Sequence, residues 1–260
     1  MRTVSSRDGT TIAYDQQGNG PVVILVGGAM STRSGPWWEQ LVELLGKDFT
    51  IISYDRRGRG DSGDTAPYAV EREVEDLEAL ITAAGGPASL FGMSSGAVLA
   101  LHAGASGLNI EKLALYEPPF IVGSNGPRPP EDAVKQLTEL ASSGRRGEAV
   151  EFFMTQVMGI PAGFVAQMKH TPMWPGLEAV AHTLAYDITI MGDWSLPHRL
   201  ASVTIPTLAI DGENSPALLR DAVQAVADTL PNARRRTLEG QTHDVSMEAL
   251  APVLAEFFAE

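Results

Sequence analysis

Hydrophobic residues gather in short runs along this chain, and stretches of helical period separate the runs. Residues 22–26 (Val-Val-Ile-Leu-Val) form a continuous apolar run, which is typical of a strand buried on both faces of a sheet. In residues 70–81 the apolar side chains instead recur every three or four positions, which indicates a helix. The same criteria predict strands at residues 11–15, 22–26, 50–54, 88–92, 112–116, 206–211 and 234–238, helices near residues 37–45, 70–81, 216–230 and 245–258, and a further helix that opens at residue 97.

Strands and helices therefore alternate, except in one central segment. Such alternation predicts a parallel sheet covered by helices on both faces. From residue 118 to 199 the pattern is helical only and is interrupted by prolines. The chain has 260 residues, 44% of them hydrophobic, which is enough for one core and a small lid. We predict an α/β fold with a doubly wound, mostly parallel sheet, in which residues 1–117 and 200–260 form the core and residues 118–199 a helical cap inserted between two late strands.

Charge and composition narrow the classes of partner. The net charge of −13 argues against nucleic acid, because binding phosphates requires clustered Lys and Arg. Arg56, Arg57 and Arg59 are interpreted as part of a solvated loop, and residues 234–236 (Arg-Arg-Arg) as a solvated strand edge. No apolar run approaches the ~18 residues of a membrane helix, and residues 1–6 do not resemble a signal peptide.

The chain also has no cysteine, no metal-ligand cluster and no nucleotide-binding loop. We therefore expect no cofactor and no metal. The simplest expectation is a cytoplasmic monomer or homodimer that acts on a small molecule, with neither nucleic acid nor membrane as a partner.

The strongest local motif is Gly-Met-Ser-Ser-Gly at residues 92–96. It follows a predicted strand and opens a predicted helix, so Ser94 stands on a sharp turn that lifts its hydroxyl out of the sheet. The flanking glycines avoid collisions in such a turn, and the helix N-terminus favours developing negative charge. We predict that Ser94 is a nucleophile; the alternative is an ordinary glycine-rich helix start.

A serine hydroxyl needs a base, and the chain has five histidines. His243 follows the last predicted strand, in Gly-Gln-Thr-His at residues 240–243. Its loop lies at the carboxyl ends of the strands, beside the Ser94 turn, where a parallel sheet places its site. We therefore predict that His243 is the base. The other four histidines lie in the helix after Ser94 or in the predicted cap: His102, His170, His182 and His198.

These motifs occur in an order that resembles the α/β-hydrolase superfamily over nearly the whole chain. Residues 22–29 resemble the family's third strand and oxyanion loop, and residues 55–62 resemble its Asp-x-Arg-Gly-x-Gly-x-Ser loop. The resemblance implies the α/β-hydrolase fold and, by position, an oxyanion hole made by the backbone N–H groups of Ala29 and Ser95. The family often has His-Gly where this chain has Gly27 and Gly28, but backbone donors survive that change.

A second departure concerns the acid that supports the histidine. The family usually places it in Gly-x-x-Asp-Pro, where residues 212–216 read Gly-Glu-Asn-Ser-Pro, so Ser215 stands in place of the carboxylate. A serine cannot stabilise an imidazolium as an anion does. In one explanation the acid has moved to Glu117 at the end of the preceding strand, as in certain haloalkane dehalogenases, and the two prolines that follow hold it. In a second explanation Asp211 or Glu213 reaches the histidine from the same loop. In a third explanation the site has no acid.

The sequence alone is compatible with three kinds of function. The leading hypothesis is a serine esterase or lactonase that cleaves a small, largely apolar substrate through an acyl-enzyme on Ser94. Because Ser215 stands where the acid is expected, the second hypothesis is a non-hydrolytic enzyme of the same family, such as a lyase, cyclase, isomerase or cofactor-free oxygenase. A binding protein with a vestigial site is the third. Ser94 argues against epoxide hydrolase or dehalogenase chemistry, which needs a carboxylate nucleophile there.

Overall fold

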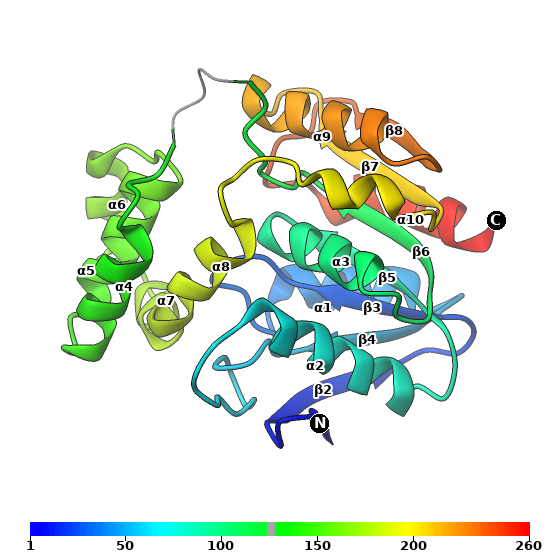
Figure 1. Ribbon diagram of the computed structural model, residues 1–260, viewed down its shortest axis with the longest axis horizontal. Coiled ribbons are helices and arrows are strands. Elements are labelled where there is room, and N and C mark those ends of the chain that lie inside the picture. Colours follow the sequence, from blue (N-terminus) through cyan, green and yellow to red (C-terminus); the bar gives the residue numbers. More distant parts are fainter. Residues whose placement is uncertain (124–127) are drawn as a thin grey trace.

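Eight strands form a single sheet in the computed structural model, which describes residues 1–123 and 128–260 (Figure 1). Their order is β1-β2-β4-β3-β5-β6-β7-β8. The pairings β1–β2 and β2–β4 are antiparallel and all the others are parallel. The predicted mostly parallel sheet is thus confirmed. The strands are β1 (Arg2–Ser5), β2 (Thr11–Gln17), β3 (Val22–Val26), β4 (Thr50–Tyr54), β5 (Ala88–Met93), β6 (Ile110–Tyr116), β7 (Thr207–Gly212) and β8 (Ala233–Leu238).

Five helices cover the two faces of this sheet. Leu41 of α1 and Leu250 of α10 are fully buried in one apolar cluster with the inward side chains of β3 and β4. Leu77 of α2, Val98 of α3 and Val223 of α9 belong to a second cluster on the opposite face. The sheet is therefore doubly wound, as the alternating pattern predicts. These helices are α1 (Pro36–Leu45), α2 (Val70–Ala83), α3 (Ser95–Ala105), α9 (Ala217–Thr229) and α10 (Met247–Ala259).

All the elements described between β6 and β7 are helical. In Figure 1 most of them stand to the left of the sheet, joined to it by α8. They share an apolar cluster of their own that includes Val150, Phe153 and Leu184. Treating residues 118–199 as a separate cap stays a prediction, and residues 124–127 lie outside the described ranges. The helices are α4 (Ala133–Ser142), α5 (Arg146–Phe152), a π-helical turn (Phe153–Val157), α6 (Ala162–Met168), α7 (Trp174–Ala179), α8 (Leu184–Met191) and two 3-10 turns (Ala181–Thr183 and His198–Ser202).

Two further observations concern the ends of the sheet. β1 was not predicted, because this edge strand carries mostly exposed polar side chains and pairs only with β2. At the other edge the arginines of residues 234–236 are exposed on β8, as expected. No helix within the described residues is long and apolar enough to cross a lipid bilayer.

The prediction that Arg56, Arg57 and Arg59 lie in a solvated loop is wrong. All three are at most 2% exposed, and each guanidinium contacts a carboxylate from a distant segment. Composition and local sequence cannot reveal such pairs, because the partners lie 17 to 131 positions away along the chain. Removing one partner of a buried pair of this kind costs about 3–5 kcal/mol.

Candidate active site

Ser94 stands between β5 and α3 in a conformation that few residues other than glycine adopt, with φ 55° and ψ −126°. Such a backbone costs about 1–3 kcal/mol and persists only where its surroundings enforce it. A Cβ on Gly96 would lie 2.2 Å from the carbonyl oxygen of Val26, and one on Gly92 would lie 2.6 Å from the Cα of Ala97. Both glycines are therefore required for the turn that presents Ser94.

The loop after β3 lies directly against this turn. A Cβ on Gly28 would come within 2.9 Å of the Met93 carbonyl oxygen and 3.1 Å of the Ser94 Cβ. Ala29, next in the loop, lines the same cavity as Ser94 and Ser95. The two residues expected to supply oxyanion donors thus line the same cavity as Ser94, one from the loop after β3 and one from the first turn of α3.

His243 and Glu117 form a direct hydrogen bond. The His243 Nδ1 atom lies 2.6 Å from Glu117 Oε2, and Glu117 Oε1 accepts the backbone N–H of Gly212 at 2.8 Å. Glu117 follows β6 with φ 46° and is fully buried, whereas the side chain of His243 is 34% exposed. One carboxylate oxygen therefore meets the imidazole while the other is held by the backbone that ends β7.

The alternative acids make other contacts. Asp211 is fully buried and binds Arg235 through a 2.6 Å hydrogen bond from Nη2, together with the hydroxyl of Thr237. Glu213 accepts the backbone N–H of Gly240 at 2.9 Å. Ser215 is buried, and its Oγ has no hydrogen-bond partner among the described residues. Of the carboxylates considered from the sequence, Glu117 is the one that the structure brings to His243.

The loop that carries His243 is itself held in place. Tyr116, the last residue of β6, donates its hydroxyl to the carbonyl oxygen of Thr242 at 2.5 Å. Burial, followed by the nearby charge of Glu117, raises the pKa of Tyr116, so the hydroxyl keeps the proton that it donates. On the other side, Trp37 Nε1 donates to the carbonyl oxygen of Val245 at 3.1 Å.

Two cavities share Ser94 and His243 in their walls. The first, here called the cap cavity, has a volume of about 320 Å³, and the second, the loop cavity, about 540 Å³. The cap cavity is apolar apart from Ser94, Ser95, Asp187 and His243. Its other lining residues are Ala29, Pro119, Ile121, Pro129, Phe153, Val157, Met158, Met191, Trp194, Pro216, Leu218 and Leu219. The loop cavity is lined by residues 28–32, 34, 35, 37, 38, 93, 94, 158, 173, 243 and 244.

Several Met and Trp residues of the central segment line these cavities. Met158 lines both, Met191 and Trp194 line the cap cavity, and Met173 lines the loop cavity. Trp174, by contrast, is buried within the apolar cluster of the helices themselves. Part of the central segment therefore forms an apolar wall of both cavities.

Asp187 is a residue of the site that sequence reasoning missed. It lies on α8, is 2% exposed, and accepts the hydroxyl of Ser95 at 2.8 Å. Its carboxylate also binds Arg56 and Arg59. Burial alone would raise the pKa of Asp187, but the two arginines hold it below its ordinary value, so the carboxylate is ionised. Nothing in the local sequence of α8 marks this position.

Comparison with known proteins extends over nearly all of the chain. The sequence profile described as "Alpha/beta hydrolase family" matches residues 22–256. A pimeloyl-[acyl-carrier protein] methyl ester esterase of Xanthomonas campestris pv. campestris is 28% identical over 239 residues, which cover 88% of this chain and 90% of that protein.

Solved structures show the same extent of similarity. An alpha/beta hydrolase from Sphaerobacter thermophilus is 58% identical, with a TM-score of 0.93, and covers 99% of this chain and 100% of its own. The enol-lactonase from Burkholderia xenovorans is 20% identical, with a TM-score of 0.74 and complete coverage of both chains. At that identity the second likeness concerns the fold alone.

Proposed function

Because the chain belongs to the alpha/beta hydrolase family, we propose that it is a serine hydrolase that cleaves a carboxylic ester or lactone through an acyl-enzyme on Ser94. The observation that carries the proposal is the Glu117–His243 pair, whose histidine lines the same largely apolar cavity as Ser94. The esterase from Xanthomonas campestris, similar over 88% of the chain, adds support for this reaction class.

In this proposal His243 activates Ser94. Glu117 accepts the Nδ1–H of the imidazole, which leaves Nε2 unprotonated and able to take the proton of the Ser94 hydroxyl. The serine oxygen then bonds to the carbonyl carbon of the substrate. As the imidazole becomes positively charged, the buried carboxylate of Glu117 stabilises it.

The negative oxygen of the tetrahedral intermediate is assigned to the backbone N–H groups of Ala29 and Ser95. Both residues line the cavity beside Ser94, and the N–H of Ser95 also lies at the positive end of the α3 dipole. Preorganised donors of this kind contribute about 2.7–4 kcal/mol each to transition-state stabilisation.

Collapse of the intermediate transfers the His243 proton to the departing alcohol and leaves the acyl group on Ser94. In the second half a water molecule gives a proton to His243 and attacks the acyl carbon. Breakdown of that intermediate returns the proton to Ser94 and releases the acid. The partial exposure of the His243 side chain is compatible with entry of this water.

The cap cavity supports a small, largely apolar group on one side of the scissile bond. Its volume of about 320 Å³ and its apolar walls suit an unbranched or cyclic hydrocarbon group of modest size. Each methylene that such a group buries contributes about 0.8 kcal/mol. The loop cavity, which is larger, would receive the other side of the ester.

The non-hydrolytic alternative rested on the missing carboxylate at Ser215. Glu117 contacts His243 instead, and this contact supports ester hydrolysis rather than the non-hydrolytic alternative. The cytoplasmic location and the monomeric or homodimeric state stay predictions.

A fluorophosphonate probe tests the proposed nucleophile. Intact-mass measurement should show one covalent adduct per wild-type chain, and peptide mapping should place it on Ser94. Ser94→Ala should take up no probe. An intact wild-type protein that neither reacts with the probe nor releases nitrophenol from short-chain nitrophenyl esters would count against the proposed function.

Narrowing the cap cavity should change the preferred chain length. Leu219 of α9 lines this cavity, and a tryptophan there would displace about two methylenes of a bound acyl chain. At about 0.8 kcal/mol each, kcat/KM for nitrophenyl octanoate should fall roughly 15-fold relative to that for the butyrate ester. Phe164→Trp, at an exposed residue of α6 that lines neither cavity, is the control and should leave the ratio unchanged.

A further inference from the structure

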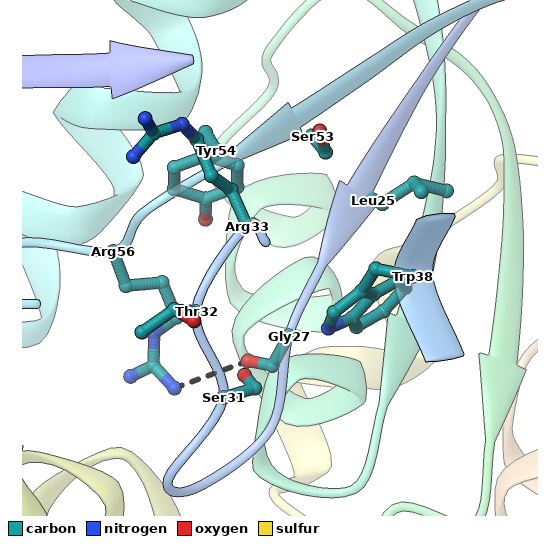
Figure 2. Close-up of a pocket in the computed structure, with 9 residues that line it drawn as sticks. All are labelled: Leu25, Gly27, Ser31, Thr32, Arg33, Trp38, Ser53, Tyr54 and Arg56. Carbon is teal, nitrogen blue, oxygen red and sulfur yellow. Dashed lines mark hydrogen bonds between the residues drawn. The ribbon is translucent and has the colours of Figure 1, made fainter. Parts of the chain in front are cut away.

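The carbonyl oxygen of Gly28 is held by two side chains. Arg59 donates to it from Nη1 at 2.6 Å, and Ser31 donates to it from Oγ at 2.7 Å. The preceding carbonyl, that of Gly27, accepts a weaker contact of 3.3 Å from Arg56, drawn as the dashed line in Figure 2. Both carbonyls of the loop that passes Ser94 are thus bonded to buried guanidinium groups.

This contact has a geometric consequence for Ala29. The Gly28 carbonyl and the Ala29 N–H belong to one peptide unit, which is planar and trans, so the two groups point in opposite directions. A guanidinium that fixes the oxygen on one side therefore fixes the N–H on the other side. The positive charge also polarises the peptide and strengthens the N–H as a donor.

Asp187 connects this contact to the second proposed donor. Its Oδ2 accepts Arg59 Nη2 at 2.6 Å, and its Oδ1 accepts both Arg56 Nη1 at 2.7 Å and Ser95 Oγ at 2.8 Å. One carboxylate from α8 is thus joined to Ser95 directly and to the Gly28–Ala29 peptide through Arg59.

We infer that Asp187 and Arg59 are positioning residues, which hold the two backbone N–H donors of Ala29 and Ser95 at the spacing that the tetrahedral oxygen requires. The inference rests on the proposed function of the site. It adds that a carboxylate on α8, outside the segments that carry Ser94 and His243, controls how well the transition state is bound.

The surroundings of Arg59 explain why an arginine is needed. Its guanidinium is 1% exposed and donates at once to Gly28, Asp187 and the hydroxyl of Thr183. A planar fork with five donors can span three partners in fixed directions, whereas the ammonium of lysine is a compact charge on a flexible stem. Arg59→Lys therefore keeps the charge and loses the geometry.

Arg57 provides a matched control. It lies two positions earlier, is equally buried, and binds Asp76 and Asp8 rather than any residue beside Ser94. The Arg57→Lys variant carries the same change in a comparable buried ion pair. It therefore measures the effect of the substitution on stability without touching the Gly28 carbonyl.

The experiment compares the two variants in ester hydrolysis and in inhibitor binding. Arg59→Lys should lower kcat roughly 10- to 100-fold with KM within about 3-fold of wild type, because misplaced donors weaken transition-state binding selectively. Phenylboronic acid, whose adduct on Ser94 carries a tetrahedral negative oxygen, should bind more weakly by a similar factor. Hexanamide, an uncharged substrate analogue, should bind as before.

Asp187→Asn should behave like Arg59→Lys, and Arg57→Lys should match wild type in all three measurements.

Two outcomes would overturn the inference. One is a loss of kcat in Arg59→Lys no larger than that in Arg57→Lys; the other is an equal loss of affinity for phenylboronic acid and hexanamide. If Arg59→Lys does not fold, Ser31→Ala tests the same carbonyl from a half-buried position, with an expected 3- to 10-fold loss of kcat and of boronic acid affinity. A wild-type protein without esterase activity would contradict the proposed function itself, so the two failures are distinguishable.

Discussion

Replacing Ser94 with alanine is expected to lower kcat for ester hydrolysis by about 10⁴- to 10⁶-fold. The substitution removes the only oxygen that can form the acyl-enzyme in the proposed mechanism, and loss of a nucleophile in a serine enzyme has an effect of this size. Stability should change little, because the hydroxyl faces a cavity and the strained backbone at this position is enforced by its neighbours. The measurement is steady-state release of nitrophenol from a short ester.

Non-additivity provides the sharper test of this prediction. Because Ser94 and His243 are proposed to act as a unit, the double variant Ser94→Ala/His243→Ala should be no slower than either single variant. Ser106→Ala, at an exposed serine just beyond the same helix, is the matched control and should retain wild-type kcat. Effects that multiply in the double variant would show that the two side chains act independently, against the proposed mechanism.

Glu117→Gln should lower kcat by about 10³- to 10⁴-fold. Gly212 donates its N–H to Oε1, so the amide oxygen of glutamine takes that position and the NH₂ group faces His243 Nδ1. An NH₂ donor there requires Nδ1 to be the acceptor, which places the imidazole proton on Nε2, toward Ser94. In that tautomer the histidine cannot take the serine proton, and a carboxylate-to-amide change in a serine protease triad has an effect of about this size.

Asp211→Asn separates this result from a general effect of removing a buried carboxylate. Asp211 is also fully buried, lies one residue before the end of the neighbouring strand β7 and loses a salt bridge with Arg235 on substitution. We expect a lower melting temperature and a kcat within about 3-fold of wild type. If Glu117→Gln kept full activity while Asp211→Asn lost it, the assignment of the acid would have to be exchanged.

The fold could be predicted where burial leaves a periodic signal in the sequence. β4 is buried along its whole length and β3 at every residue except Val22, and their apolar runs predicted both strands with the observed bounds. β1 left no such signal, because an edge strand of exposed polar residues is specified by its pairing with β2 rather than by its own composition.

The residues of the candidate site were likewise predictable only where the local sequence marks them. Ser94 and His243 could be proposed from the sequence because a local pattern marks each of them: a glycine-flanked turn for Ser94 and a loop after a strand for His243. Glu117 could only be one of several alternatives, because a choice between acids at the ends of adjacent strands depends on which side chain points inward. Asp187 gave no signal at all, since it contacts Ser95 across 92 positions and Arg59 across 128.

The position of Glu117 has a consequence for how this enzyme can diversify. With Glu117 at the end of β6 as the proposed acid, the segment after β7 has no part in the proposed proton transfer. Three residues of that segment, Pro216, Leu218 and Leu219, line the cap cavity. Substrate preference can therefore be altered through these positions without disturbing the reacting groups. In laboratory evolution, a library confined to this segment should yield many active clones with changed selectivity, whereas the equivalent loop of a relative that keeps its acid there would tolerate far fewer changes.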